Sequence, residues 1–169
     1  GYDDLIIGAD GTDNNGTDSG SSYVVFGVAA GMGATVNLSS LDGTTGFRLD
    51  GETAVDTVSS AGDINGDGYD DLIIGTPYTD INGNNSGSSY VVYGKASAFA
   101  STVNLSDLNG TTGFRLDGEA AGDQSSWSVS SAGDVNGDGY DDLIIGAWYA
   151  DNNGSKSGSS YVVFGTDNA

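Results

Sequence analysis

The chain has 169 residues and carries 24 Asp and Glu against 4 Lys and Arg, a formal net charge of −20. A compact fold tolerates such self-repulsion poorly unless something positive, such as bound cations, offsets it. The charge also argues against a nucleic-acid partner or an anionic lipid surface, because either would add like charge to like charge. Because it contains no Cys and no His, the chain has no disulfide, no thiolate site and no histidine base.

The amino-terminal residues Gly-Tyr-Asp-Asp include no starting Met and lack the basic and apolar regions of a signal peptide. We therefore expect the chain to be processed, excised or incomplete. Its longest apolar runs, such as 23–26 and 143–145, are far shorter than the ~20 residues that span a bilayer. The sequence therefore predicts no membrane insertion.

Four sequence blocks recur in a fixed order, and each contains one short apolar run bounded by Gly, Asn, Asp or Ser. The block Gly-Tyr-Asp-Asp-Leu-Ile-Ile-Gly begins at Gly1, Gly68 and Gly139, which gives periods of 67 and 71 residues. The other blocks begin at Ser19, Ser86 and Ser157, at Asn37 and Asn104, and at Val58 and Val129. Short runs between such turn residues are typical of β-strands, so each repeat is predicted to contain four strands.

No segment shows a sustained helical period, so the sequence predicts an all-β fold. Four-stranded antiparallel units at a fixed interval are typical of β-propeller blades, which stack on their neighbours to bury their faces. A β-sandwich is the alternative, and such close internal repetition disfavours it. The near-continuous apolar runs suit strands covered on both faces. We therefore expect Tyr23, Tyr90 and Tyr161 to pack between blades.

The order of the blocks predicts about two and a half blades. Residues 1–57 are predicted to form a partial blade with strands two to four, residues 58–119 a complete blade, and residues 120–169 a partial blade with strands one to three. The complete blade has a shortened first strand, because four residues are missing before it and Trp127 has no counterpart there. A closed propeller needs about 4 to 8 blades, so we expect missing sequence or other copies to complete the structure.

The strongest chemical signal is a nine-residue segment, Asp-(Ile/Val)-Asn-Gly-Asp-Gly-Tyr-Asp-Asp, at 63–71 and again at 134–142. Oxygen-bearing side chains at its first, third and fifth positions, with Gly at the sixth, let a tight loop wrap around a hard cation. Calcium is the expected ion, because magnesium requires a smaller octahedral cage and transition metals prefer His or Cys. Asp and Gly also favour turns without any metal, but the clustered carboxylates would then repel one another.

The end of this segment differs from an EF-hand, which places an acidic residue at position twelve and continues into a helix. Here position twelve is Ile74 or Ile145, inside an apolar run. The ninth-position acid can instead return a carboxylate to the ion, and the seventh residue can offer its carbonyl. The eighth-position residues, Asp70 and Asp141, are expected to lie behind the ligands or to face solvent.

With the Leu-Ile-Ile-Gly run that follows, these loops resemble the FG-GAP repeat of integrin alpha-subunit propellers and their bacterial relatives. The name-giving Gly-Ala-Pro is altered, for example to Gly146-Ala147-Trp148. In that family the loop joins the first two strands of a blade and binds calcium through positions one, three, five, seven and nine. The resemblance implies two sites: Asp63, Asn65, Asp67, the Tyr69 carbonyl and Asp71, and Asp134, Asn136, Asp138, the Tyr140 carbonyl and Asp142. A third loop keeps only Tyr2 and Asp4, so a third site requires missing sequence or another chain.

Two further features have competing interpretations. Trp127 and Trp148 lie in the last repeat alone and form either an exposed binding patch or part of the core or rim. Arg48 and Arg115 are expected to pair with neighbouring acids rather than to recognise a substrate. The Asp-x-Asn-Gly loops after the second strand of each repeat are expected to be hairpin turns rather than secondary cation sites.

The sequence therefore predicts a secreted or cell-surface module for cell adhesion, in which calcium rigidifies a β surface that contacts another protein or a matrix component. The alternative is a structural subunit that self-assembles into a ring or filament through its incomplete terminal blades. An enzyme is disfavoured, because the Asp clusters are already assigned to metal and no Ser has a visible base.

Overall fold

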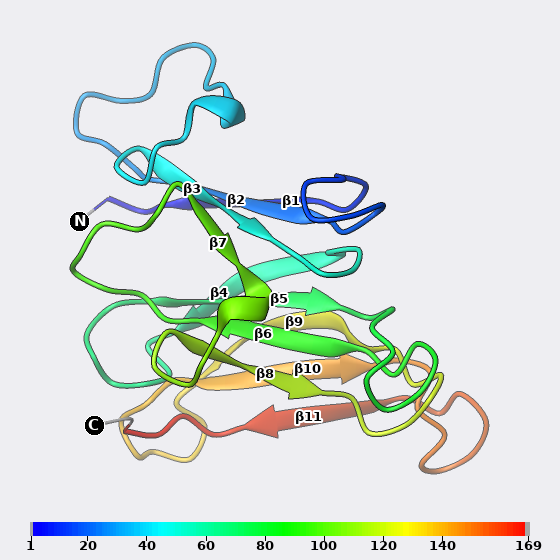
Figure 1. Cartoon of the computed structure of the whole chain (residues 1–169). Helices are drawn as coiled ribbons and strands as arrows, with labels where there is room; N and C mark the ends of the chain where they lie inside the picture. Colours follow the sequence, from blue (N-terminus) through cyan, green and yellow to red (C-terminus); the bar gives the residue numbers. More distant parts are fainter. Residues whose placement is uncertain (1, 168–169) are drawn as a thin grey trace.

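The computed structural model describes residues 2–167, and this part of the chain is an all-β fold with no α-helix (Figure 1). Its strands are β1 (Leu5–Ala9), β2 (Ser21–Val25), β3 (Gly46–Asp50), β4 (Thr57–Gly62), β5 (Asp71–Thr76), β6 (Ser88–Val92), β7 (Thr102–Asn104), β8 (Gly113–Asp117), β9 (Ser125–Gly133), β10 (Asp142–Ala147) and β11 (Ser159–Val163). Two 3-10 turns, η1 (Leu38–Ser40) and η2 (Leu105–Asp107), interrupt the loops before β3 and β8. The predicted all-β class is confirmed.

The strands form three sheets that stack in chain order like the blades of a propeller (Figure 1). The first sheet has the strand order β1-β2-β3-β7, the second β4-β5-β6-β8, and the third β11-β10-β9. Within each sheet the consecutive strands pair antiparallel, and the pairing is in the same register in each repeat: Ile7 faces Tyr23, Ile74 faces Tyr90 and Ile145 faces Tyr161. The repeated sequence therefore folds into a repeated sheet.

The sequence did not predict β7. This three-residue strand lies between β6 and β8 in the chain, yet it pairs in parallel with β3 of the first sheet, where Thr102 faces Arg48 and Val103 faces Leu49. The connection from β6 to β8 therefore crosses to the first sheet and returns. Such a short, half-buried strand shows no alternating pattern of its own, so periodicity could not reveal it.

The core lies between the sheets. In β5, Ile73 and Ile74 point to opposite faces of the sheet. Ile74 packs against the first sheet and Ile73 against the third, so both side chains are completely buried. This two-sided burial explains the continuous apolar run in the sequence. Tyr90 is buried between the first and second sheets and its hydroxyl group donates to Glu52 Oε2 at 3.3 Å, while Tyr23 and Tyr161 are only partly buried.

Candidate metal centre

The two predicted metal loops lie at equivalent places, one joining β4 to β5 and the other joining β9 to β10. Each loop turns sharply at two glycines with positive φ: Gly66 and Gly68 have φ of 74° and 87°, and Gly137 and Gly139 have 78° and 98°. Residues with a Cβ rarely adopt this backbone conformation. The glycines of the motif are therefore required by the path of the chain.

In the first loop the backbone closes around the Asp63 carboxylate. Its Oδ1 accepts the Asp67 N–H at 3.0 Å and its Oδ2 accepts the Gly68 N–H at 2.9 Å. The Asn65 amide nitrogen donates to Asp67 Oδ2 at 3.1 Å, and Asp67 Oδ1 accepts the Tyr69 N–H at 2.9 Å. The fifth position is therefore bonded to both the first and the third.

The second loop repeats this arrangement. Asp134 accepts N–H groups from Asp138 at 3.1 Å and Gly139 at 2.9 Å, and the Asn136 amide donates to Asp138 Oδ2 at 2.8 Å. Asp138 Oδ1 in turn accepts the Tyr140 N–H at 3.0 Å. The same hydrogen bonds form in two loops that pack in different surroundings, so the local sequence itself determines the loop geometry.

The ninth-position acids are held differently, because both are completely buried. Asp71 Oδ1 accepts the Gly94 N–H at 2.8 Å and Oδ2 accepts the Ile64 N–H at 3.1 Å. Burial raises the pKa of Asp71 to about 7, the two N–H groups oppose this rise, and the nearby charges of Asp67 and Asp63 add to it. Each ninth-position carboxylate therefore joins the loop to the end of the third strand of its blade.

Asp142 repeats the arrangement of Asp71. Its two oxygens accept the Gly165 N–H at 2.9 Å and the Val135 N–H at 2.9 Å.

The predicted ligands lie on the same loops, but their acidic groups do not converge. Within residues 2–167, no three acidic side chains gather around one point as they would around a metal ion. Asp63 and Asp134 instead accept hydrogen bonds from their own loops. The donor set fits a hard divalent cation, since it consists of carboxylate, amide and carbonyl oxygens without nitrogen or sulfur donors.

Comparison with known proteins identifies the repeat. The FG-GAP repeat family matches residues 56–92 and 126–163, and each match contains one complete loop. The chain therefore contains two FG-GAP repeats. The two matches are called the first and second FG-GAP repeats below.

Several integrin alpha subunits are similar to these FG-GAP repeats. Integrin alpha pat-2 of Caenorhabditis elegans is 36% identical over 110 residues, which is 62% of this chain and 9% of that protein. Integrin alpha-6 of Gallus gallus is 30% identical over 107 residues, 63% of this chain and 9% of that protein. Integrin alpha-PS2 of Drosophila melanogaster is 38% identical over 88 residues, 52% of this chain and 6% of that protein. The chain thus spans less than a tenth of these relatives.

The eighth-position acid has a role that the sequence did not reveal. Asp141 of the second FG-GAP repeat reaches the loop of the first: its Oδ2 accepts the Asp63 N–H at 2.9 Å, and its own N–H donates to the Asp63 carbonyl at 3.1 Å. The only sequence signal was that an Asp stands at this position in both loops. The contact joins positions far apart in the chain, so local spacing could not identify it.

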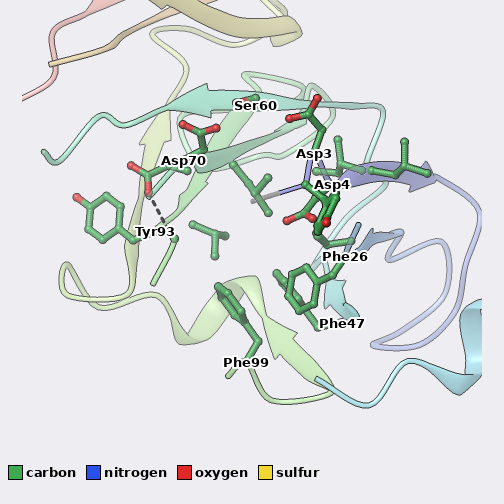
Figure 2. A pocket seen from close by; sticks show the side chains of 16 residues that line it. Asp3, Asp4, Phe26, Phe47, Ser60, Asp70, Tyr93 and Phe99 are labelled. Carbon is green, nitrogen blue, oxygen red and sulfur yellow. Dashed lines mark hydrogen bonds between the residues drawn. The ribbon is translucent and has the colours of Figure 1, made fainter. Parts of the chain in front are cut away.

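The partial loop precedes the first FG-GAP repeat. Asp4 Oδ1 accepts the Gly27 N–H at 2.8 Å, the same contact that Asp71 makes with Gly94. Asp4 and Tyr2 line a hollow of about 360 Å³ between the first and second sheets, together with Asp3 and Asp70. Figure 2 shows Asp3 and Asp70 on one side of this hollow, and Phe47 and Phe99 on the opposite side.

The two tryptophans of the second FG-GAP repeat lie side by side on the surface. Their ring centroids are 4.8 Å apart, and Trp127 and Trp148 are 39% and 47% exposed. The predicted pairing of the arginines with acids is confirmed, since Arg48 Nε lies 2.7 Å from Asp50 and Arg115 Nε lies 2.7 Å from Asp117. Within residues 2–167 no helix is long and apolar enough to cross a bilayer.

Proposed function

We propose that the chain is a calcium-binding part of an extracellular or cell-surface protein, and that it presents a rigid β surface to another protein or a matrix component. One observation carries this proposal: the two FG-GAP loops have the same residue at every position but the second, and they form the same hydrogen bonds to the first-position Asp. The similarity to integrin alpha subunits supports it. Each loop holds one ion through the residues in its first, third, fifth, seventh and ninth positions.

The chain's own residues explain how a loop-bound ion stiffens the surface. A calcium ion supplies positive charge and oxygen coordination. Asp71 and Asp142 connect their loops to the ends of β6 and β11 through Gly94 and Gly165. Fixing a loop therefore fixes the end of its blade, and Asp141 extends the constraint to the neighbouring loop. Two ions also reduce the formal charge of −20.

Thermal unfolding with calcium and with a chelator tests this proposal. A ligand that binds only the folded state raises the melting temperature as its concentration exceeds the Kd. We expect calcium to raise the melting temperature and expect Asp67→Ala together with Asp138→Ala to remove most of the increase. Asp107→Ala, which changes an acid outside both loops, serves as the control. A melting temperature that does not respond to calcium contradicts the proposal.

We propose no catalytic role for the chain. The acids of the two loops are engaged with backbone amides or assigned to the ions, and the chain contains no His or Cys to serve as base or nucleophile. Hydrolase activity that survives purification and follows the protein through every column would contradict this.

Exposed apolar side chains favour self-assembly as a second candidate. On the outer face of the third sheet, Ile144, Val162 and Phe164 are 39%, 47% and 56% exposed. The matching residues of the second sheet, Ile73, Val91 and Tyr93, are buried between sheets. On the opposite end, Leu5 and Ile7 of β1 are also exposed.

Both exposed faces are apolar. Stacking the third sheet of one copy on the first sheet of the next would therefore bury both faces in a head-to-tail contact. Light scattering in calcium tests this candidate: a mass that grows with concentration, and that falls on Phe164→Asp, is expected. A monomer at all concentrations excludes it.

A further inference from the structure

The outer edge of β11 is open. The third sheet has the strand order β11-β10-β9, so within residues 2–167 no strand lies beyond β11 (Figure 1). In the other two sheets the equivalent strands, β2 and β6, are covered on that side by β3 and β8. The middle serine of each strand reflects this difference, because Ser22 and Ser89 are buried whereas Ser160 is exposed. β11 is therefore an edge strand at a position that is internal in the other two sheets.

The strand that covers the equivalent edges has the same sequence in both sheets. Residues 46–50 and 113–117 both read Gly-Phe-Arg-Leu-Asp, and both pair antiparallel in one register. In that register Phe114 faces Val91. Because β2, β6 and β11 all read Ser-Ser-Tyr-Val-Val, the same strand fits β11 with its Phe opposite Val162. The molecule thus contains two examples of the segment that fits the open edge.

Backbone groups at both ends of β6 bond to the covering strand. The Tyr93 N–H donates to the Thr112 carbonyl at 3.1 Å, and the Gly118 N–H donates to the Gly87 carbonyl at 2.8 Å. The first sheet has the same two bonds at the ends of β2. Because bonded pairs alternate along antiparallel strands, every second residue of β6 directs its backbone groups at β8.

The equivalent backbone groups of β11 are unpaired. They include the Phe164 N–H and the Gly158 carbonyl, for which no hydrogen bond is found among residues 2–167. The same alternation directs the backbone groups of Ser160 and Val162 at the open edge, since the residues between them bond to β10. A whole row of donors and acceptors is therefore available to an added strand.

Two polar side chains beside the edge match the same strand. The Ser88 hydroxyl donates to the Asp117 carboxylate at 3.0 Å, and the Asn82 amide donates to the carbonyl of the next residue at 2.8 Å. Ser159 and Asn153 stand at the equivalent positions of the third sheet. Within residues 2–167, neither side chain donates such a hydrogen bond. The polar contacts that fix the end of the covering strand are thus unfilled here.

Phe164 marks the place where the Phe of an added strand would pack. In the second sheet the ring centroids of Tyr93 and Phe114 are 5.9 Å apart, and in the first sheet those of Phe26 and Phe47 are 5.8 Å apart. Each pair joins the residue after the third strand to the Phe of the fourth. Phe164 occupies the first of these positions and is exposed. An added strand with Phe at the matching position would restore the ring pair.

A folded second copy cannot supply this strand without opening one of its own sheets. Phe47 and Leu49 of β3 are completely buried, and β8 is paired with β6 along its length. The occupant is therefore a segment of another polypeptide that is not already paired in a sheet. Arg115 lies 2.7 Å from Asp117 of its own strand, so such a segment balances its own charges and needs no charged surface on β11.

We propose that the edge of β11 binds an extended segment of a partner protein by strand addition, and that this segment has the pattern Gly-Phe-Arg-Leu-Asp. In this binding mode main-chain hydrogen bonds supply affinity, and the alternating side chains supply specificity. The inference rests on the protein-contact role proposed above, and it names the contact surface and the partner segment.

A peptide with the sequence of residues 111–118, with both termini capped, is the probe. It is labelled and titrated by fluorescence anisotropy in saturating calcium, and light scattering gives the mass of the complex. We expect saturable binding of one peptide to one chain, with changed amide NMR shifts at Ser160, Val162 and Phe164. Absence of binding overturns the proposal. A dimer whose β11 edge excludes the peptide also overturns it, because a second copy would then be the occupant.

Two methylated peptides distinguish strand addition from nonspecific contact. The Arg48 N–H faces away from β2 and donates to the Ser101 carbonyl at 3.0 Å. By the same alternation, the Arg N–H of the peptide faces away from β11 and the Leu N–H faces it. Methylating the Leu nitrogen removes a hydrogen bond and should weaken binding at least about fivefold. Methylating the Arg nitrogen is the matched control and should leave the affinity unchanged. Equal effects of the two methyl groups contradict the proposal.

A pair of protein variants tests the edge from the other side. Val162→Pro removes an N–H that faces the open edge, and proline is tolerated on an edge strand at such a position. Val162→Thr keeps this N–H and the branched side chain. We expect the proline variant to lose peptide binding and the threonine variant to keep it. Unchanged binding by the folded proline variant refutes the proposal. The calcium melting curve is read separately, so loss of peptide binding with calcium stabilisation intact contradicts only this inference.

Discussion

Asp141 of one FG-GAP repeat is bonded to Asp63 of the other through both its backbone and its side chain, with distances of 3.1 Å and 2.9 Å. The first residue of one candidate calcium loop is therefore held in place by the eighth residue of the next. The two loops form a connected pair, and a change in either affects the other.

Replacing Asp141 with Ala should weaken calcium binding at the first loop, although the substitution lies in the second. The Asp63 N–H would lose a charged acceptor, and such a hydrogen bond contributes about 1.5–3 kcal/mol. Isothermal titration of calcium should show one weakened site. Asp70→Ala, at the same position of the first loop, should leave the second site unchanged. If Asp141→Ala weakens neither loop, the coupling has no energetic role.

The ninth-position acids should stabilise the fold even without metal. Asp71→Ala would leave the buried Ile64 N–H and the half-buried Gly94 N–H without their acceptor, and an unsatisfied buried donor costs about 1–3 kcal/mol. Urea unfolding in a chelator should therefore show a large loss for Asp71→Ala and almost none for Asp67→Ala, whose side chain is exposed. In calcium, both variants should be destabilised. Equal stability of the two in chelator would refute this division of roles.

Tyr90 should make the protein lose stability in alkali. Burial raises the pKa of Tyr90 to about 12, the charge of Glu52 adds to the rise and Arg115 opposes it, whereas an unfolded Tyr ionises near pH 10. Tyr90 therefore keeps its proton to a higher pH in the folded state than in the unfolded state. Its contribution to the free energy of unfolding is fully present below about pH 10 and is lost as the pH rises towards 12. The free energy of unfolding, measured by urea titration, should fall across this window.

Tyr90→Phe removes this titrating group, so the fall between pH 10 and 12 should become shallower. Tyr2→Phe, in which an exposed tyrosine is replaced, provides the control. The interpretation fails if the two variants have the same pH profile.

Gly75 should tolerate no side chain, because β5 passes very close to β9. A Cβ on Gly75 would lie 2.4 Å from the Ser126 carbonyl oxygen, and such overpacking costs about 1–3 kcal/mol. Gly75→Ala should therefore lower the melting temperature. Gly11→Ala is the matched control, since nothing lies within 4 Å of its added Cβ. A change in melting temperature equal to that of Gly11→Ala would disprove the close contact.

The sequence predicted features that depend on neighbouring residues and missed those that depend on distant ones. The loops at 63–71 and 134–142, the stacked β sheets and the Arg48 and Arg115 ion pairs follow from local spacing and from repetition. The bond from Asp141 to Asp63 and the contact of Tyr78 with Trp127 join residues many positions apart, so no local pattern specifies them. The ligand role of the loop acids stays a prediction.

The crossing of β7 has a consequence for how the molecule comes apart. Residues 102–104 belong to the chain segment of the second sheet but pair with β3, so the first and second sheets share a strand. Among residues 2–167, the third sheet shares no strand with the second and is joined to it by side-chain packing and by backbone hydrogen bonds at its edges, such as that from the Ser125 N–H to the Ser86 carbonyl. Separating the first sheet from the second therefore requires the backbone hydrogen bonds between β3 and β7 to break, among them the bond from the Arg48 N–H to the Ser101 carbonyl. Hydrogen exchange should be slow at the Arg48 amide, because it opens only when this pair separates.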